Sequence, residues 1–155
     1  MMLETSTLTA ADVMTRDVVT VRPHTSLIYV AKILGQRHIS GVPVLEESGQ
    51  LAGIVTEADL VRWHDADADK QAWWLHMLAE GFNLNPSFLD YVRSEQDKVR
   101  NVMHTEVVTV APETPVSEIA RLMTKKSIKR VPVLRDGKLV GIVARSDLVK
   151  ALANG

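Results

Sequence analysis

Residues 107–152 have the sequence VVTVAPETPVSEIARLMTKKSIKRVPVLRDGKLVGIVARSDLVKAL, and residues 18–60 have the sequence VVTVRPHTSLIYVAKILGQRHISGVPVLEESGQLAGIVTEADL. The two stretches are copies of one pattern. The matched positions are 19–21, 42–45, 53–55 and 59–60 in the first copy, and 108–110, 131–134, 141–143 and 147–148 in the second. An internal repeat of this length indicates that each copy is one structural unit, stacked on its neighbour.

Each copy predicts the element order β-α-β-β-α. Val18–Val21 is a short apolar strand that ends before a proline, and apolar residues then recur with helical spacing from Leu27 to Leu34. Val42–Leu45 and Leu51–Val55 predict two further strands joined by a turn, and a helix is expected from Thr56.

Two turn and cap signals accompany these elements. Asp136-Gly137 is a strong hairpin signal between the last two strands of the second copy. Thr9 and Asp12 have the spacing of a capping box, which predicts a short helix through Met14.

The repeated pattern resembles the cystathionine-β-synthase domain, or CBS domain, which usually occurs in tandem pairs. The resemblance implies an α/β fold in which two β-α-β-β-α repeats pack with pseudo-twofold symmetry. We expect an N-terminal tail at 1–10, a first repeat at 11–61, a helical insertion at 62–98 and a second repeat at 99–153. A single copy of about 50 residues buries only a marginal core, so the copies are expected to form one module.

Composition excludes several classes of function. The formal net charge of -1 argues against a general nucleic-acid binder, which needs a basic face. The absence of cysteine excludes disulfides and thiol catalysis. No apolar run is long enough to span a membrane and no signal peptide precedes the first repeat, so we expect a cytoplasmic protein.

The segment Thr56-x-x-Asp59 follows a predicted strand and has two interpretations. It is a capping box, in which Asp59 accepts the first backbone N–H groups of a helix. Taken by itself the pattern favours capping, but the same geometry suits a binding site, because a helix N-terminus attracts phosphate and a carboxylate accepts both hydroxyls of a ribose.

The family resemblance favours the binding interpretation. In CBS pairs the motif G-h-h-T/S-x-x-D, where h is hydrophobic, binds the ribose and phosphate of adenine nucleotides, and Gly53–Asp59 fits it in full. The second copy keeps Asp147 but has Ala144 in place of the hydroxyl residue. The resemblance also implies that Lys129 and Arg130 reach the phosphate held at the first motif.

The second site is expected to be the weaker one. It faces Ser40 and Gly41, which carry no charge, although Arg145 lies beside it in the sequence. Apolar walls for an adenine ring are expected from strand residues, represented by Val42 and Val131.

The insertion has no counterpart in the repeat. Trp73 and Trp74 are expected to pack against the module or a second chain. The acidic run Asp65–Asp69 lacks the glycine and the glutamate of a calcium loop, so we expect no metal site.

The resulting hypothesis is a regulatory module, not an enzyme, that binds AMP, ADP or ATP and needs no obligatory cofactor. Ligand binding is expected to shift the packing of the repeats, and a separate protein target is expected to respond. The alternative is a CBS-type interaction module with a vestigial cleft that acts through oligomerisation. In either case we expect a homodimer.

Overall fold

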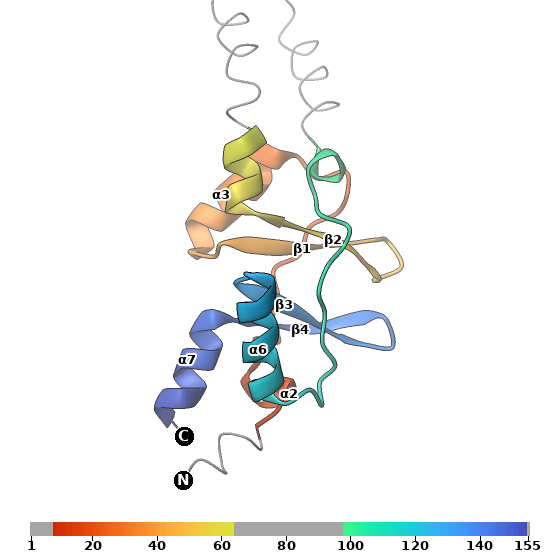
Figure 1. Ribbon diagram of the computed structural model, residues 1–155. Helices are drawn as coiled ribbons and strands as arrows, with labels where there is room; N and C mark the ends of the chain where they lie inside the picture. Colours follow the sequence, from red (N-terminus) through yellow and green to blue (C-terminus); the bar gives the residue numbers. More distant parts are fainter. Residues whose placement is uncertain (1–7, 64–97, 155) are drawn as a thin grey trace, which may run out of the picture.

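The structure is a computed structural model that describes residues 8–63 and 98–154 (Figure 1). Nearly all of the expected tail and insertion lies outside these residues, including Trp73, Trp74 and the acidic run Asp65–Asp69. Nine labelled elements occur in the described part. They are α2 (Ala10–Val13), α3 (Leu27–Arg37), β1 (Gly41–Leu45), β2 (Leu51–Thr56), the short 3-10 helix η1 (Val99–Asn101), α6 (Val116–Lys126), β3 (Arg130–Arg135), β4 (Lys138–Ala144) and α7 (Arg145–Asn154).

The two predicted hairpins are present and share one register. In the first, β1 and β2 pair with Val42 opposite Val55, and the register shifts after Val44. In the second, β3 and β4 pair with Val131 opposite Val143, with the same shift at the matching position. The predicted turn Asp136-Gly137 has positive φ at both residues, as a tight two-residue hairpin turn requires.

The expected first strand of each repeat is reduced to a single parallel bridge. Val21 pairs only with Val44, and Val110 pairs only with Val133. The amide of Val21 donates to the carbonyl of Pro43 at 3.1 Å. The amide of Leu45 donates to the carbonyl of Val21 in return. Extending the ladder to Val19 would need an N–H donor at Pro43, and proline has none. Pro132 interrupts the ladder of the second repeat in the same way.

Each repeat is completed by a segment that precedes the other one. Helix α2 is followed by Thr15, which pairs with Ile142 of β4. Helix η1 is followed by His104, which pairs with Ile54 of β2 through reciprocal bonds of 2.9 and 3.0 Å. Ala10 accordingly belongs to the hydrophobic core of the second repeat. The two packed units are therefore not continuous in sequence, because each includes a segment that precedes the other repeat.

A close backbone approach explains the glycine of each G-I-V segment. A Cβ atom on Gly53 would lie 2.5 Å from the carbonyl oxygen of His104, so only glycine allows this crossing. At Gly141 the same atom would meet the side chain of Met14 and, at 3.1 Å, the carbonyl oxygen of Thr15. The crossing segments thus pass directly over the strands that lead to Asp59 and Asp147.

The two units stack with their hairpins toward each other and their helices at the outer ends (Figure 1). A bridge between Gln50 and Lys138 joins the two hairpins near their turns. The predicted apolar face of α3 is buried at Leu27, Val30 and Leu34, as expected from its spacing. The α/β fold of two repeats with matching contacts is therefore confirmed.

Candidate functional site

Each returning strand leads directly into a helix whose third residue is an aspartate. Strand β2 leads into the helical residues 57–63, and β4 leads into α7. Asp59 accepts the backbone N–H of Thr56, and Asp147 accepts that of Ala144, both at 2.8 Å. The capping interpretation of both aspartates is therefore correct. Their remaining surroundings differ.

The carboxylate of Asp59 is buried and fully occupied by this chain's own groups. One oxygen accepts the backbone N–H of Thr56 and its hydroxyl at 3.1 Å. The other oxygen contacts the guanidinium of Arg62 and lies 2.6 Å from Nε2 of His104. The side chain of Asp59 is only 2% exposed. Its hydrogen-bonding capacity is thus satisfied from within the protein.

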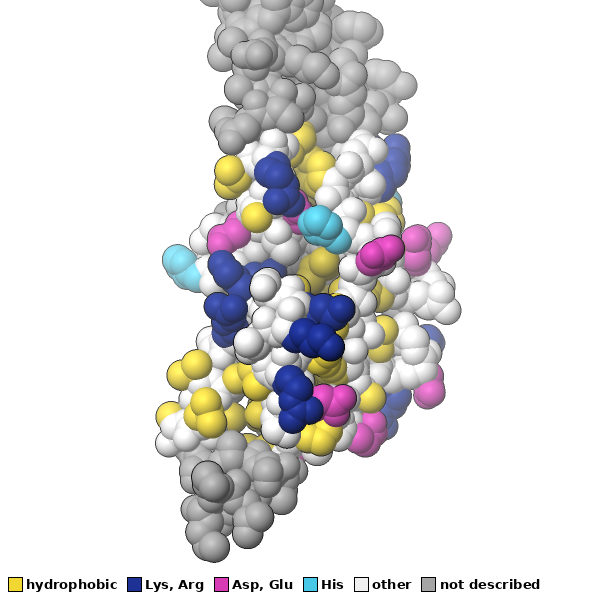
Figure 2. All heavy atoms as spheres, in the orientation of Figure 1, with side chains coloured by type: hydrophobic (Ala, Val, Ile, Leu, Met, Phe, Trp, Pro, Cys, Tyr) yellow, Lys and Arg dark blue, Asp and Glu magenta, His cyan; other side chains and the backbone are white. Residues whose placement is uncertain are grey.

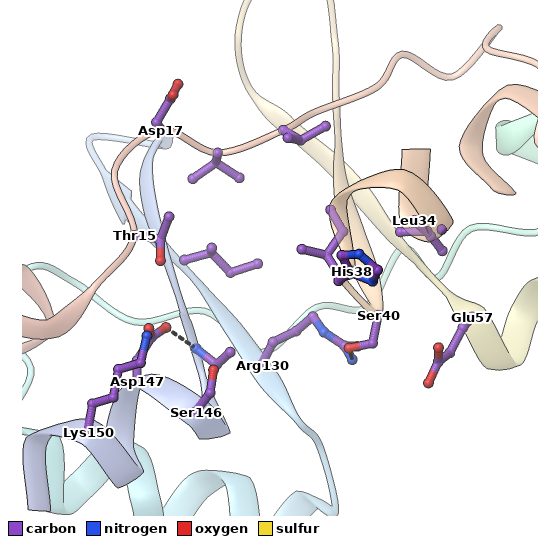
Figure 3. A pocket seen from close by; sticks show the side chains of 17 residues that line it. Thr15, Asp17, Leu34, His38, Ser40, Glu57, Arg130, Ser146, Asp147 and Lys150 are labelled. Atoms are coloured by element: carbon purple, nitrogen blue, oxygen red, sulfur yellow. Dashed lines mark hydrogen bonds between the residues drawn. The ribbon is translucent and has the colours of Figure 1, made fainter. Parts of the chain in front are cut away.

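The carboxylate of Asp147 is partly exposed and has one hydrogen bond. One of its oxygens accepts the N–H of Ala144. Among the described residues, no other group bonds to this carboxylate, because Ala144 has no hydroxyl to offer and Thr15 and Lys150 make no bond to it. Figure 3 shows Asp147 with this bond at the wall of a cavity.

Among the described residues, the clefts where the repeats meet include one next to each of these aspartates. The first has a volume of about 830 Å³ and contains Thr56. Its lining carries the cations Arg62, Lys129 and Arg130 and the carboxylates of Glu57 and Glu106. The apolar lining comes from Ile54, Val61, Val107, Val108 and Ile128. Its charged lining is therefore cationic on balance, which favours anions.

The second cleft has a volume of about 540 Å³ and contains Asp147 (Figure 3). Its cations are Arg130 and Lys150, and its other carboxylates are Asp17 and Glu57. The apolar lining comes from Val18, Val19, Leu34, Ile39 and Ile142. With Asp147 included, three carboxylates face two cations, so the charged lining of this cleft is anionic on balance.

Arg130 lines both clefts and lies between them. Its guanidinium donates to the hydroxyl of Ser40, and it would be 2.9 Å from a Cβ atom on Gly41. Burial lowers the pKa of Arg130, while the carboxylates of Glu57 and Asp59 raise it. Because a guanidinium keeps its proton in proteins, Arg130 provides a positive charge to both sites. The sequence predicts that this second cleft faces the uncharged Ser40 and Gly41, whereas the structure adds the cation Arg130.

The structure brings some of the predicted site residues together and separates others. Thr56, Lys129 and Arg130 line the first cleft, and Asp147 lines the second. Arg145 is exposed and lines neither of these clefts.

Val42 and Val131, expected to wall an adenine ring, have no exposed surface and line neither cleft. Both point into the repeat cores, because alternate residues of β1 and β3 supply those cores. The apolar cleft walls come instead from β2 and β4, from the segments at 18–19 and 107–108, and from helix residues such as Leu34 and Val61.

Sequence reasoning missed His104 and Arg62. A signal for both existed in the alignment of the copies, which places His104 opposite Thr15 and Arg62 opposite Lys150. Like Thr56 and Ala144, these residues occupy matching positions but are not identical in the two repeats. The role of His104 and Arg62 follows from their contacts with Asp59, which only the folded chain makes.

Charged side chains gather on one face of the molecule. Figure 2 shows Lys and Arg side chains across the middle of one face, with a few Asp and Glu side chains among them. Within residues 8–63 and 98–154, no three His, Asp or Glu residues gather as metal ligands. In the same residues, no helix is both long and apolar enough for a bilayer crossing.

Comparison with known proteins identifies related chains. The family model described as the CBS domain matches residues 10–65 and 99–154. An uncharacterized protein of Methanocaldococcus jannaschii is 34% identical over 150 residues, which cover 91% of this chain and 89% of that protein.

Two crystal structures are similar over nearly the whole chain. One is the CBS domain of a CBS domain-containing membrane protein from Sphaerobacter thermophilus, at 32% identity and a TM-score of 0.68, covering 96% of this chain and 90% of that one. The other is CBSX2 in complex with AMP, at 25% identity and a TM-score of 0.72, covering 95% of this chain and 97% of that one.

Proposed function

The chain belongs to the CBS domain family, with two repeats of that domain, and from this we propose that it is a regulatory module that binds an adenine nucleotide. The observation that carries the proposal is the pair of clefts between the repeats, each next to an aspartate at the start of a helix. The AMP complex of the similar CBSX2 supports an adenosyl ligand.

The clefts offer binding groups suited to each part of a nucleotide. A carboxylate accepts the two ribose hydroxyls, and a guanidinium such as that of Arg130 binds phosphate. The candidate ligand residues that line the clefts are therefore Thr56, Lys129 and Arg130 at the first cleft, and Arg130 and Asp147 at the second. We assign them a binding role rather than a catalytic one.

Regulation follows from the position of the clefts between two units. A ligand in the first cleft would contact Thr56 of the first repeat and Arg130 of the second. A ligand in the second cleft would contact Ser40 of the first repeat and Asp147 of the second. Such a ligand stabilises the relative arrangement of the repeats that fits it best. A separate protein target then responds to that arrangement.

A thermal-shift screen with AMP, ADP, ATP, NAD and S-adenosylmethionine tests the proposal. A ligand at 100 times its dissociation constant stabilises the folded state by about 2.7 kcal/mol. For a chain of this length, that raises the melting temperature by roughly 5–10 °C. If none of the five ligands shifts the melting temperature at millimolar concentration, the nucleotide-binding proposal fails.

A second candidate is an interaction module that works through oligomerisation. Large apolar side chains are exposed on the helices: Ile28 and Tyr29 on α3, Val61 after β2, and Val149 and Leu152 on α7. Apolar faces of this kind favour a homodimer, which stays a prediction, as does the cytoplasmic location. A chain that dimerises but binds no adenosyl ligand supports this candidate over the first.

A further inference from the structure

We propose that His104 and Arg62 determine which cleft accepts the ribose: they keep Asp59 occupied, so a ligand with a 2′,3′-diol binds at Asp147. This inference rests on the proposed function, because the adenosyl ligand supplies the diol. It reverses the ranking expected from the sequence, in which the complete motif Gly53–Asp59 marks the stronger site.

Hydrogen-bond capacity is the first reason. A carboxylate has about four acceptor positions on its two oxygens, and a diol needs two of them. Asp59 already accepts from the N–H and the hydroxyl of Thr56, from Arg62 and from His104. A diol can bind there only if it displaces two of these groups. Displacing Arg62 would also break an ion pair with the carboxylate.

Burial is the second reason. Asp59 is 2% exposed and does not line the first cleft, although Thr56, Arg62 and His104 all do. These residues therefore form the wall between the cleft and the carboxylate. The hydroxyl of Thr56, which the motif assigns to a phosphate, is directed to Asp59 instead.

Asp147 meets both requirements that Asp59 fails. It lines the second cleft, and among the described residues Ala144 is its only hydrogen-bond partner. The positions of Arg62 and His104 are taken in this repeat by Lys150 and Thr15, which line the cleft without bonding to the carboxylate (Figure 3). One oxygen of Asp147 is thus available to a ligand.

The second cleft also offers a contact for the rest of the ligand. Arg130 reaches into it as far as Ser40, and Lys150 stands on the opposite wall (Figure 3). Asp17, Glu57 and Asp147 outnumber these two cations in the lining. The diol contact at Asp147 therefore contributes more to affinity in this cleft than the attraction of a phosphate.

Titration calorimetry on the full chain with AMP and with 2′,3′-dideoxy-AMP tests the assignment. We expect wild-type protein to bind one AMP per chain and to bind the dideoxy analogue at least tenfold more weakly. Asp147→Asn should weaken AMP at least tenfold and abolish the preference for the diol. Asp136→Asn, which removes a carboxylate from an exposed turn far from both clefts, is the matched control and should change neither value.

A reciprocal exchange between the repeats tests the role of His104 and Arg62. The double variant His104→Thr/Arg62→Lys gives the first cleft the residues of the second, and it should bind a second AMP per chain. The converse Thr15→His/Lys150→Arg should weaken AMP binding at the second cleft at least tenfold. Both exchanges keep the backbone pairs with Ile54 and Ile142, and circular dichroism verifies folding.

The outcomes separate this inference from the function on which it rests. AMP binding that survives Asp147→Asn, or two equivalent sites in the wild type, contradicts the assignment to Asp147 alone. A double variant His104→Thr/Arg62→Lys that is folded but binds no second AMP contradicts the role of those two residues. Failure of every variant to bind AMP contradicts the proposed function and this inference together.

Discussion

Replacing Gly53 by alanine should destabilise the first repeat and displace His104. The new Cβ atom would lie 2.5 Å from the carbonyl oxygen of His104, a separation that real Cβ atoms do not adopt. That oxygen belongs to the backbone and is held by reciprocal bonds with Ile54, so it cannot rotate away as a side chain would. The crossing segment must therefore move as a unit, and the contact between His104 and Asp59 moves with it.

The magnitude follows from what the shift breaks. Two backbone hydrogen bonds contribute about 0.5–1.5 kcal/mol each. Overpacking a well-packed site destabilises the fold by about 1–3 kcal/mol more. Alanine also lowers the conformational entropy of the unfolded chain, which stabilises the folded state by about 0.4–1 kcal/mol. These ranges give a fall of about 1–6 kcal/mol in the free energy of unfolding, and the middle value of about 3 kcal/mol corresponds to roughly 6–12 °C in melting temperature.

Urea denaturation followed by circular dichroism measures this change, and two other glycines serve as controls. Gly141→Ala should cost less, because the atom it meets first is the flexible side chain of Met14. Gly35→Ala lies in the interior of α3 with no atom within 4 Å of the new Cβ, and should stabilise the protein by about 0.5–1 kcal/mol. A Gly53→Ala protein as stable as the wild type would refute the argument that the crossing segment requires glycine.

Three further predictions concern charge and assembly. Arg130→Ala should weaken AMP at least tenfold in calorimetry, since hydrogen bonds to charged groups contribute about 1.5–3 kcal/mol, and should weaken adenosine less; equal losses for both ligands point to a structural role. The backbone and side-chain bonds from Thr9 lower the pKa of Asp12 below 3.8, so its contribution to stability is present above that pH and is lost as the pH falls through the lower folded value. Asp12→Asn should therefore lower the melting temperature at about pH 7 and have little effect at about pH 2, whereas equal effects at both would contradict the linkage. Light scattering at micromolar concentration should give twice the mass of the chain, because apolar residues such as Ile28 and Leu152 are exposed; the mass of a single chain would exclude the homodimer.

Local pattern was sufficient for the repeated architecture. The V-P-V and G-I-V segments predicted both hairpins, and helical spacing predicted the buried face of α3, because alternation and helical periodicity depend on near neighbours in the sequence. The first strands at 18–21 and 107–110 were overestimated. Apolar content alone does not show that Pro43 and Pro132 remove the donor that a longer ladder requires.

The candidate site was only partly predictable for the same physical reason. The sequence by itself identified Asp59 and Asp147 as equivalent positions and Arg130 as a nearby cation. Only the tertiary structure placed His104, which is 45 residues away from Asp59, against one carboxylate, and left the other with a single bond from the described part of the chain. A motif specifies which groups a carboxylate could bind, whereas crossing segments determine which groups reach it. The availability of each aspartate is therefore a property of the fold and not of the motif.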